Sequence, residues 1–209
     1  MINLISSGSM ADENGNSHNY NILEGVDLVK TLDIQKKWIY EFAMRFINLQ
    51  TDNPGISDFD LMQKYNLQDS HWNWVGKAMQ LNNPDYLWFS LESNGQVEAI
   101  IVVYHPQKSR IISDDIYYID YLAVAPWNRV VGNASRKFKG LGPTLIKEAG
   151  KYIGVNLSYG YSFSLHSLPQ ASGFYTRIGM TDFGPDVSKD NMHYFEIQEQ
   201  IAKDFVYGI

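Results

Sequence analysis

The spacing of apolar residues divides the chain into a helical first part and a second part in which strands and helices alternate. Apolar residues recur at helical spacing from residue 26 to residue 49, and shorter helices are predicted at 57–66 and 72–81. Further on the period shortens, and strands are predicted at 86–92, 97–104, 116–124, 161–167 and 192–197. Additional predictions are helices at 140–153 and 169–178, a short edge strand at 20–23 and a terminal helix or tail at 201–206. This order predicts an α/β (α+β) protein whose mixed sheet is covered by helices.

Some of the predicted strands have a more definite place in that sheet. The strands at 86–92 and 97–104 flank Asn94-Gly95, a dipeptide typical of a tight hairpin turn because both central residues need positive φ. The strand at 116–124 is apolar on both faces, as expected for a central strand covered on both sides. Counting by two along it places Tyr118, Asp120 and Leu122 on one face, so Asp120 is predicted to stand in an apolar row.

Length and composition are those of one domain with a short extension. The chain has 209 residues, of which 44 % are hydrophobic, enough for a substantial core. Residues 6–19 are mostly Ser, Gly, Asn and acidic residues, so residues 1–19 are predicted to form a flexible tail that precedes a single domain at 20–209; residues 7–10 resemble a cloning remnant. No apolar run is long enough for a membrane span, and the first residues lack the pattern of a secretory signal, so the expected location is cytoplasmic.

Cysteine, histidine and charge narrow the chemistry further. Without cysteine the chain has no disulfide, thiolate metal site or cysteine nucleophile. The five histidines share no metal-ligand spacing, so no metal is expected. The net charge is −6, yet six basic residues and one glutamate lie between Arg129 and Lys151. Nucleic-acid binding, which requires a wide basic face, is not expected, whereas one basic segment suits a phosphorylated cofactor.

The basic segment leads into a glycine-containing turn between a strand and a helix. Gly140 and Gly142 precede the predicted helix, whose first backbone amides lack intrahelical partners and attract anions. This order forms a seat for a phosphate group, although an ordinary strand-to-helix turn has the same pattern. The dinucleotide-binding fingerprint does not fit, because Leu145 stands where its third small residue belongs. The phosphate loop that ends in Gly-Lys-Ser/Thr is excluded by Pro143-Thr144.

Three segments in sequence order resemble the GNAT superfamily of acyl-CoA-dependent N-acetyltransferases. They are Ile119–Pro126 (IDYLAVAP), Lys137–Gly142 (KFKGLG) and Ala171–Met180 (ASGFYTRIGM). The resemblance covers residues 84–197 and implies a mixed, mostly antiparallel central sheet flanked by helices. Lysine replaces the Gln or Arg that begins the family's phosphate motif, and Leu168 and Met180 replace the Asn and Phe of its later motif.

The resemblance implies that acetyl-CoA is the co-substrate and suggests its binding residues. The backbone of the central strand would contact the pantetheine arm, the turn before the helix would hold the pyrophosphate, and the arm would pass near Ser167. The residues implied are Leu122, Ala123, Val124, Lys137, Phe138, Lys139, Gly140, Leu141, Gly142, Thr144 and Ser167.

Two side chains are candidates for proton transfer. Asp120 stands where related enzymes often carry an acidic residue, and burial would raise its pKa toward that of a useful base. The alternative is a carboxylate that only bonds a loop, with a chain of water molecules as the base. Tyr175 matches the tyrosine of the family's later motif and would protonate the CoA thiolate, unless it is only a packed core residue. His166 is either a proton relay or an ordinary hydrogen-bonded histidine.

The sequence therefore predicts an N-acetyltransferase that moves an acetyl group from acetyl-CoA to a primary amine by direct attack in a ternary complex. A covalent acetyl-enzyme is not expected, since no cysteine is present. One alternative is a catalytically silent acyl-CoA-binding or partner-binding module with the same fold. Another, a nucleic-acid-directed acetyltransferase, is disfavoured by the acidic charge. The acceptor is expected to be a small-molecule or peptide amine, no membrane partner is expected, and a homodimer is an open alternative.

Overall fold

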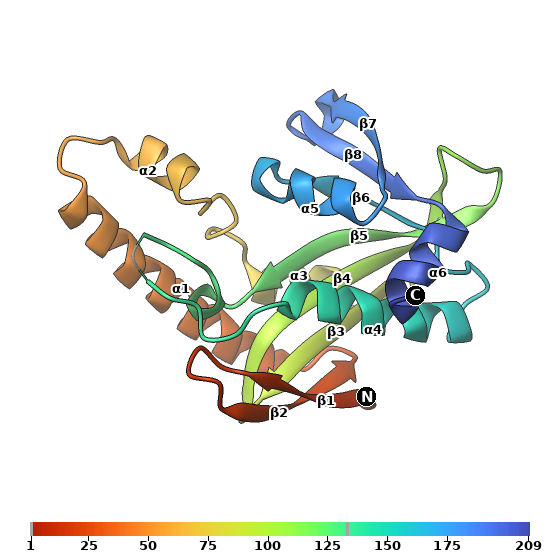
Figure 1. Cartoon of the computed structure of the whole chain (residues 1–209), viewed down its shortest axis with the longest axis horizontal. Helices are drawn as coiled ribbons and strands as arrows, with labels where there is room; N and C mark the ends of the chain where they lie inside the picture. The colour runs from red at the N-terminus through yellow and green to blue at the C-terminus, as the bar shows by residue number, and fades with distance from the viewer. Residues whose placement is uncertain (1, 133) are drawn as a thin grey trace.

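Over residues 2–132 and 134–209, which it describes, the computed structural model contains an eight-stranded sheet with helices on both faces (Figure 1). The strand order is β1-β2-β3-β4-β5-β6-β8-β7, and neighbours are antiparallel except β5 and β6, which are parallel. The strands are Asn3–Ala11 (β1), Ser17–Glu24 (β2), Tyr86–Ser93 (β3), Gln96–Lys108 (β4), Asp115–Val124 (β5), Phe163–Ser167 (β6), Thr181–Asp186 (β7) and Met192–Ile197 (β8). The prediction of a mixed, mostly antiparallel sheet flanked by helices is confirmed.

The helices form two groups that bury opposite faces of the sheet. They are Leu28–Asp52 (α1), Asp58–Lys64 (α2), Trp74–Gln80 (α3), Leu141–Asn156 (α4), Ser172–Arg177 (α5) and Glu199–Tyr207 (α6). One apolar cluster contains Leu145 of α4, Tyr175 of α5 and Ala202 of α6, and the other contains Trp38 of α1 and Trp74 of α3. Side chains of a strand alternate between the two faces, so β5 is covered on both sides, as its apolar sequence predicts.

Local side chains explain where several elements begin and turn. The carboxylate of Asp27 accepts hydrogen bonds from the amides of Val29 and Lys30 and so caps the start of α1. Asn94 and Gly95 both have positive φ, 50° and 73°, and β3 pairs with β4 on either side of them. The predicted hairpin turn is therefore confirmed.

The first residues form a hairpin that extends the sheet. β1 pairs with β2, and β2 pairs with β3, so the prediction of a flexible tail is wrong for residues 3–19. The strand predicted at 20–23 exists, but it is not an edge strand, because β1 lies outside it. Asp12 shapes the turn by accepting hydrogen bonds from the amides of Asn14 and Asn16, and Ile5 and Met10 pack against the core. Such sparse apolar positions do not produce a recognisable strand period.

The other edge strand, β7, was also not predicted. Its sequence, TDFGPD, contains Gly and Pro, which weaken a strand and are tolerated mainly at an edge. β7 pairs with β8 alone and brings Asp182 and Asp186 into the sheet.

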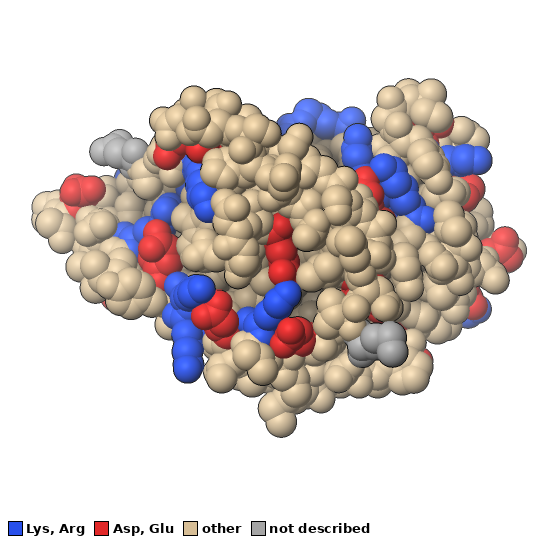
Figure 2. All heavy atoms as spheres, turned by 90° about the horizontal axis from the view of Figure 1, so that it is seen from below, with Lys and Arg blue, Asp and Glu red and all other residues tan. Residues whose placement is uncertain are grey.

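Charged side chains are spread over the surface. On the face shown in Figure 2, basic and acidic residues are interspersed and neither forms a broad patch. None of the helices that the structure describes is both long enough and apolar enough to cross a bilayer.

Candidate functional site

The strands β5 and β6 separate near the middle of the sheet. They pair in parallel only over Tyr117–Ile119 and Phe163–Leu165. β5 continues to Val124, still paired with β4 on its other side, whereas the chain leaves β6 at Ser167 and turns into α5. Among residues 2–132 and 134–209, no strand pairs with this edge of β5 beyond Ile119. Backbone groups on that edge are therefore available to a ligand.

The alternation of hydrogen bonds decides which residues of β5 face this open edge. Ala125 donates its amide to the carbonyl of Glu98, next to the start of β4, over 2.9 Å. In an antiparallel ladder the bonded pairs alternate, so Ala123 also bonds to β4, whereas Leu122 and Val124 present their N–H and C=O groups to the other side. Of the three strand residues predicted to contact the cofactor, Leu122 and Val124 thus face the open edge and Ala123 does not.

The first turn of α4 adjoins that edge. Gly140 caps the helix with a φ of 75°, a left-handed conformation that glycine adopts readily. The amides of Gly140, Leu141 and Gly142 precede the first intrahelical hydrogen bond, which Thr144 donates to Gly140 over 3.0 Å. Thr144 is among the residues that the resemblance implies for the cofactor, but its amide is used within the helix. A Cβ atom added at Gly142 would lie 3.9 Å from Leu122 Cδ2, so the helix start and the strand edge are neighbours.

Much of the basic loop before α4 is bonded to the protein itself. Lys137 Nζ lies 3.0 Å from Oε1 of Glu98, a carboxylate with 0 % exposure. Phe138 is buried, and its amide donates to the side chain of Asn128 over 3.1 Å. Lys137 and Phe138, both predicted to contact the cofactor, thus have structural partners. Lys139 is exposed.

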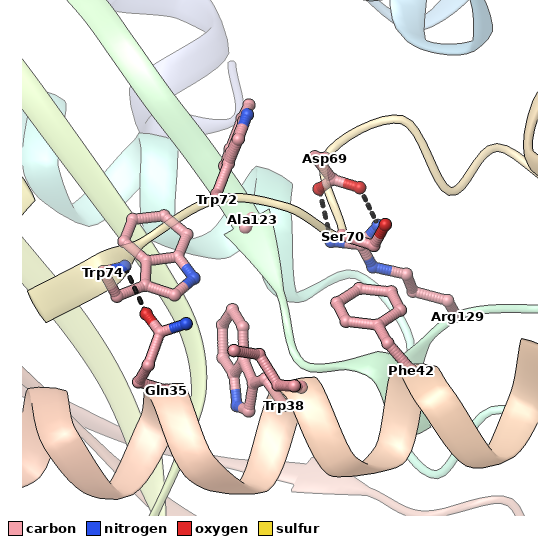
Figure 3. A pocket seen from close by; sticks show the side chains of 10 residues that line it. Gln35, Trp38, Phe42, Asp69, Ser70, Trp72, Trp74, Ala123 and Arg129 are labelled. Carbon is pink, nitrogen blue, oxygen red and sulfur yellow. Dashed lines mark hydrogen bonds and ion pairs between the residues drawn. The ribbon is translucent and has the colours of Figure 1, made fainter. Parts of the chain in front are cut away.

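Arg129, at the start of the same loop, is also engaged. It forms a two-bond ion pair with Asp69, with distances of 2.7 and 2.6 Å (Figure 3). Its Nε donates to the carbonyl of Val124 over 3.0 Å, which closes one of the open groups of β5. Trp38 and Trp74 fill the adjoining space between α1 and β5 and leave a cavity of about 10 Å³. That volume admits no more than a single water molecule, so this space is not an acceptor pocket.

A larger hollow lies between the start of α4 and the tip of the β1–β2 hairpin. Its volume is about 520 Å³, and its lining includes Asp12, Glu13, Lys139, Leu141 and Thr144. A β-bridge between Asp12 and Phe138 and a hydrogen bond from Ser135 to Glu13 fix the hairpin tip at this position. The volume is in the range of small-molecule sites, and the Thr144 amide, which is bonded within the helix, is not available there.

A β-bulge sets the direction of Asp120. Tyr121 lies opposite Val102 and Ile119 lies opposite Val103, so Asp120 is an extra residue in β5. Ile119 and Leu122 therefore both pack on the α4 side of the sheet, whereas Tyr121 packs on the α1 and α3 side. The prediction that Asp120 and Leu122 share a face is wrong, because it assumed a regular strand.

Asp120 lies in a cluster of aromatic and cationic side chains. Burial raises the pKa of Asp120, and the cations of Lys189 and Lys77 partly oppose this effect. Lys77 extends from α3, and its Nζ lies 3.5 Å from the ring centroid of Tyr121 and 5.6 Å from that of Trp72. A carboxyl group with a raised pKa suits a general base. Lys77 was not predicted; its only sequence signal is a single lysine within an aromatic helical segment.

Tyr175 lies on the opposite face of the sheet from Asp120. It is buried on α5, with its ring centroid 5.8 Å from that of Phe195, and burial raises the pKa of Tyr175 to about 12. Its hydroxyl has no hydrogen-bond partner within the described part of the chain. Ser167 is buried too, and its hydroxyl donates to the carbonyl of Leu168 over 2.8 Å. The structure therefore groups Tyr175 with the α4 side of β5 and Asp120 with the α3 side.

His166 of β6 links Tyr118 of β5 to Asp186 of β7 through its two ring nitrogens. Its Nδ1 lies 2.8 Å from the Tyr118 hydroxyl and its Nε2 lies 3.3 Å from Asp186. Burial lowers the pKa of His166, and the hydrogen bond to Asp186 acts against that shift. This arrangement is that of a hydrogen-bonded histidine. No three His, Asp or Glu side chains in the described ranges are grouped as a metal site would require.

Comparison with known proteins connects this geometry to a fold. No protein-family model and no curated protein matches the sequence. Among solved structures, the chain is similar to an uncharacterised protein from Bacillus halodurans, with 11 % identity, 99 % coverage of each chain and a TM-score of 0.56. It is also similar to the PaiA N-acetyltransferase of Thermoplasma acidophilum in complex with coenzyme A. That match has 14 % identity, covers 85 % of this chain and 98 % of the other, and has a TM-score of 0.50. The fold is GNAT-like, and the resemblance seen in the sequence is confirmed at that level.

Proposed function

We propose that this chain is an N-acetyltransferase that moves an acetyl group from acetyl-CoA to a primary amine in a ternary complex. The observation that carries the proposal is the open edge of β5 at Leu122 and Val124, directly beside the amides at the start of α4 that make no intrahelical hydrogen bond. Open strand groups suit the two amides of a pantetheine arm, as they would suit an added strand. The amides at a helix start suit a pyrophosphate.

The residues at the start of α4 fit such a co-substrate. Among the described residues, a Cβ atom at Gly140 would meet nothing within 4 Å and one at Gly142 would meet only Leu122, so the backbone of this turn is accessible to a bulky anion. Lys139 adds an exposed cation, and Thr144 adds a hydroxyl at the rim of the neighbouring hollow. The pantetheine contacts would come from Leu122 and the Val124 amide.

The positions of the side chains suggest how they share the reaction. Acetyl-CoA, when bound, would supply the thioester. The amide of Leu122 would donate a hydrogen bond to the carbonyl oxygen as negative charge develops there. Asp120 faces α3, so the amine would approach from that side and pass its proton to this carboxylate. Tyr175, on the α4 side, would hold a proton for the departing sulfur, since a hydroxyl with a pKa of about 12 stays protonated at neutral pH.

Calorimetry with CoA and acetyl-CoA, followed by thiol release over a panel of primary amines, tests the proposal. We expect binding of both compounds and thiol release with at least one amine. Gly142→Asp should weaken binding at least tenfold, because it places a carboxylate where the phosphates would lie. Asn156→Asp, which adds the same charge at the other end of α4, is the matched control. Absence of CoA binding would contradict the proposal, whereas binding without thiol release would favour the silent acyl-CoA-binding module.

A further inference from the structure

We propose that Lys77 is an acetylation site that this chain modifies by its own acetyl transfer, because its amine lies over the ring of Tyr121 and near that of Trp72, and Tyr121 directly precedes Leu122 on β5. This inference rests on the proposed function. The inference also makes the proposed function more specific, because it identifies an unbranched primary alkylamine as a chemical group that the acceptor side can hold.

The contacts of Lys77 differ from those of Lys30 and Lys137, two other partly buried lysines. Lys30 and Lys137 each pair with a glutamate, at 2.7 and 3.0 Å. Lys77 Nζ instead lies over the Tyr121 ring at 3.5 Å, with no hydrogen-bonded carboxylate among the residues that the structure describes. An ammonium over an aromatic face is attracted by the ring but keeps its nitrogen free of a fixed acceptor. The amine can therefore leave this position without breaking an ion pair.

The surroundings of Lys77 also favour its neutral, nucleophilic form. Burial lowers the pKa of Lys77, and the nearby charge of Asp120 partly opposes that shift. The Lys77 amine lies over the ring of Tyr121, which directly precedes Leu122. The amide of Leu122 is proposed to hold the acetyl carbonyl oxygen. Lys77 also approaches from the α3 side of β5, the side of the proposed base.

The transfer step balances with groups already named. The neutral Lys77 nitrogen attacks the thioester carbon, an N–C bond forms and the C–S bond breaks. The nitrogen loses one proton to Asp120, and the departing CoA thiolate gains one from Tyr175. The products are acetyl-Lys77 and free CoA thiol.

Peptide mass spectrometry after incubation with isotope-labelled acetyl-CoA tests this step directly. Lys64 is the matched control: its Nζ lies 5.1 Å from the Tyr65 ring centroid, but it is exposed and bonds to Asn53 at 3.2 Å. Lys64 therefore reports the uncatalysed acetylation of an exposed lysine. We expect Lys77 to be labelled at least tenfold faster than Lys64, and Lys77→Arg to lose that label. Equal labelling, or none at Lys77, would overturn the inference.

The direction in which Asp120→Asn changes the labelling rate of Lys77 separates enzymatic from simple chemical acetylation. Removing the carboxylate lowers the pKa of Lys77 further, since Asp120 raises it. A purely chemical reaction at Lys77 would then become faster. Loss of the base should instead slow the enzymatic reaction, by at least tenfold. Faster labelling of Lys77 in this variant would contradict the proposal.

A footprinting experiment gives a readout that needs no catalysis. Lys77 and Lys64 are labelled with an N-hydroxysuccinimide ester in the presence and absence of CoA without an acetyl group. We expect CoA to protect Lys77 at least threefold and to leave Lys64 unchanged. If calorimetry shows CoA binding and Lys77 is not protected, this inference fails while the proposed function stands. If calorimetry shows no binding, both fail.

Discussion

The two neighbouring parts of the candidate site differ in whether their polar groups already have partners. The loop before α4 contains most of the charge, but Arg129 is paired with Asp69 and Lys137 with Glu98. The edge of β5 and the first turn of α4 contain almost no charge, yet Leu122, Gly140 and Gly142 have backbone groups with no partner among the residues that the structure describes. Arg129 and Lys137 thus support the structure, while the exposed Lys139 and the neutral backbone are what the protein leaves open to a ligand.

This difference shows why charge in a sequence is a weak guide to a binding site. A buried carboxylate such as Glu98 requires a cation and hydrogen bonds, and the loop supplies Lys137, Trp127 and Asn128 to it. The charges are then no longer available to a phosphate group. The predictions below separate the two roles, beginning with the largest expected effect.

Replacing Asp120 with Asn should have the largest effect on catalysis. The amide cannot accept a proton, so kcat/KM for thiol release should fall by about 100-fold or more. Affinity for CoA should stay within about twofold, because Asp120 faces α3 rather than the α4 side. The measurement is steady-state kinetics beside calorimetry. Asp190→Asn, which changes an exposed acid at a position of positive φ, serves as the control. Wild-type kinetics in the Asp120 variant would favour a water chain as the base.

Lys137→Ala should destabilise the fold strongly. It leaves the Glu98 carboxylate, which has 0 % exposure, without its cation. Removing one partner of a fully buried ion pair costs about 3 kcal/mol or more. Lys137 is partly exposed, so the expected loss of stability is smaller than that. Urea unfolding measures the change, and Glu98→Gln, which keeps hydrogen-bond acceptor capacity, should lose less. A stable Lys137→Ala protein with weakened CoA binding would reverse the roles assigned to the two regions.

Tyr175→Phe should lower turnover by about 10- to 100-fold and leave the fold intact. The hydroxyl makes no hydrogen bond within the described ranges, so its removal leaves no buried group unsatisfied. Affinity for acetyl-CoA should change little, because the ring and its packing against Phe195 are retained. Phe174→Leu, on the adjacent position of α5, controls for altered packing. Equal turnover in Tyr175→Phe would exclude Tyr175 as the proton donor.

Much of the fold was predictable from the sequence because its signals are local. The Asn94-Gly95 turn requires positive φ at both positions, and the amphipathic period of α1 spans seven turns. The β1–β2 hairpin was not predictable in this way, since its stability depends on pairing with β3, about 65 residues further along the chain. Gly184 and Pro185 in β7 likewise point to a loop unless the neighbouring strand is known.

The candidate site was predictable in part for the same reason. Gly140 carries its signal in its own conformational freedom, since its φ is 75°, and both Gly140 and Gly142 lie at the start of α4, as the predicted helix requires. The direction of Asp120 depends on a bulge, which one extra residue in β5 creates relative to β4. The engagement of Lys137 depends on Glu98, 39 residues earlier in the chain. Tertiary partners of this kind leave no local pattern.

Lys139→Ala should have a smaller effect, confined to binding. Lys139 is exposed beside the amides of α4, so its loss should weaken CoA binding by about three- to fivefold, in line with the strength of exposed ion pairs. The effect should shrink as salt increases, because salt screens exposed charges. Stability should not change, in contrast to Lys137→Ala. Lys36→Ala, an exposed change on α1, is the control, and a similar loss of affinity there would remove Lys139 from the site.

The smallest expected effect is a gain in stability when Asp120 becomes Asn. Burial raises the folded-state pKa of Asp120 above its ordinary value of 3.8, so the fold favours the protonated carboxyl group. The associated stability is fully present below the unfolded-state pKa and is lost as pH rises through the higher, folded-state value. At a pH above the folded-state value the wild-type protein has lost this contribution, while Asn stays neutral, so the variant should there be more stable by less than about 1 kcal/mol. Its advantage should diminish as pH falls toward 4. Melting curves of both proteins over this pH range measure the difference in stability. A more stable wild type at pH 7 would mean that Lys77 and Lys189 stabilise the Asp120 charge by more than burial costs. Asp120 would then be a poor base.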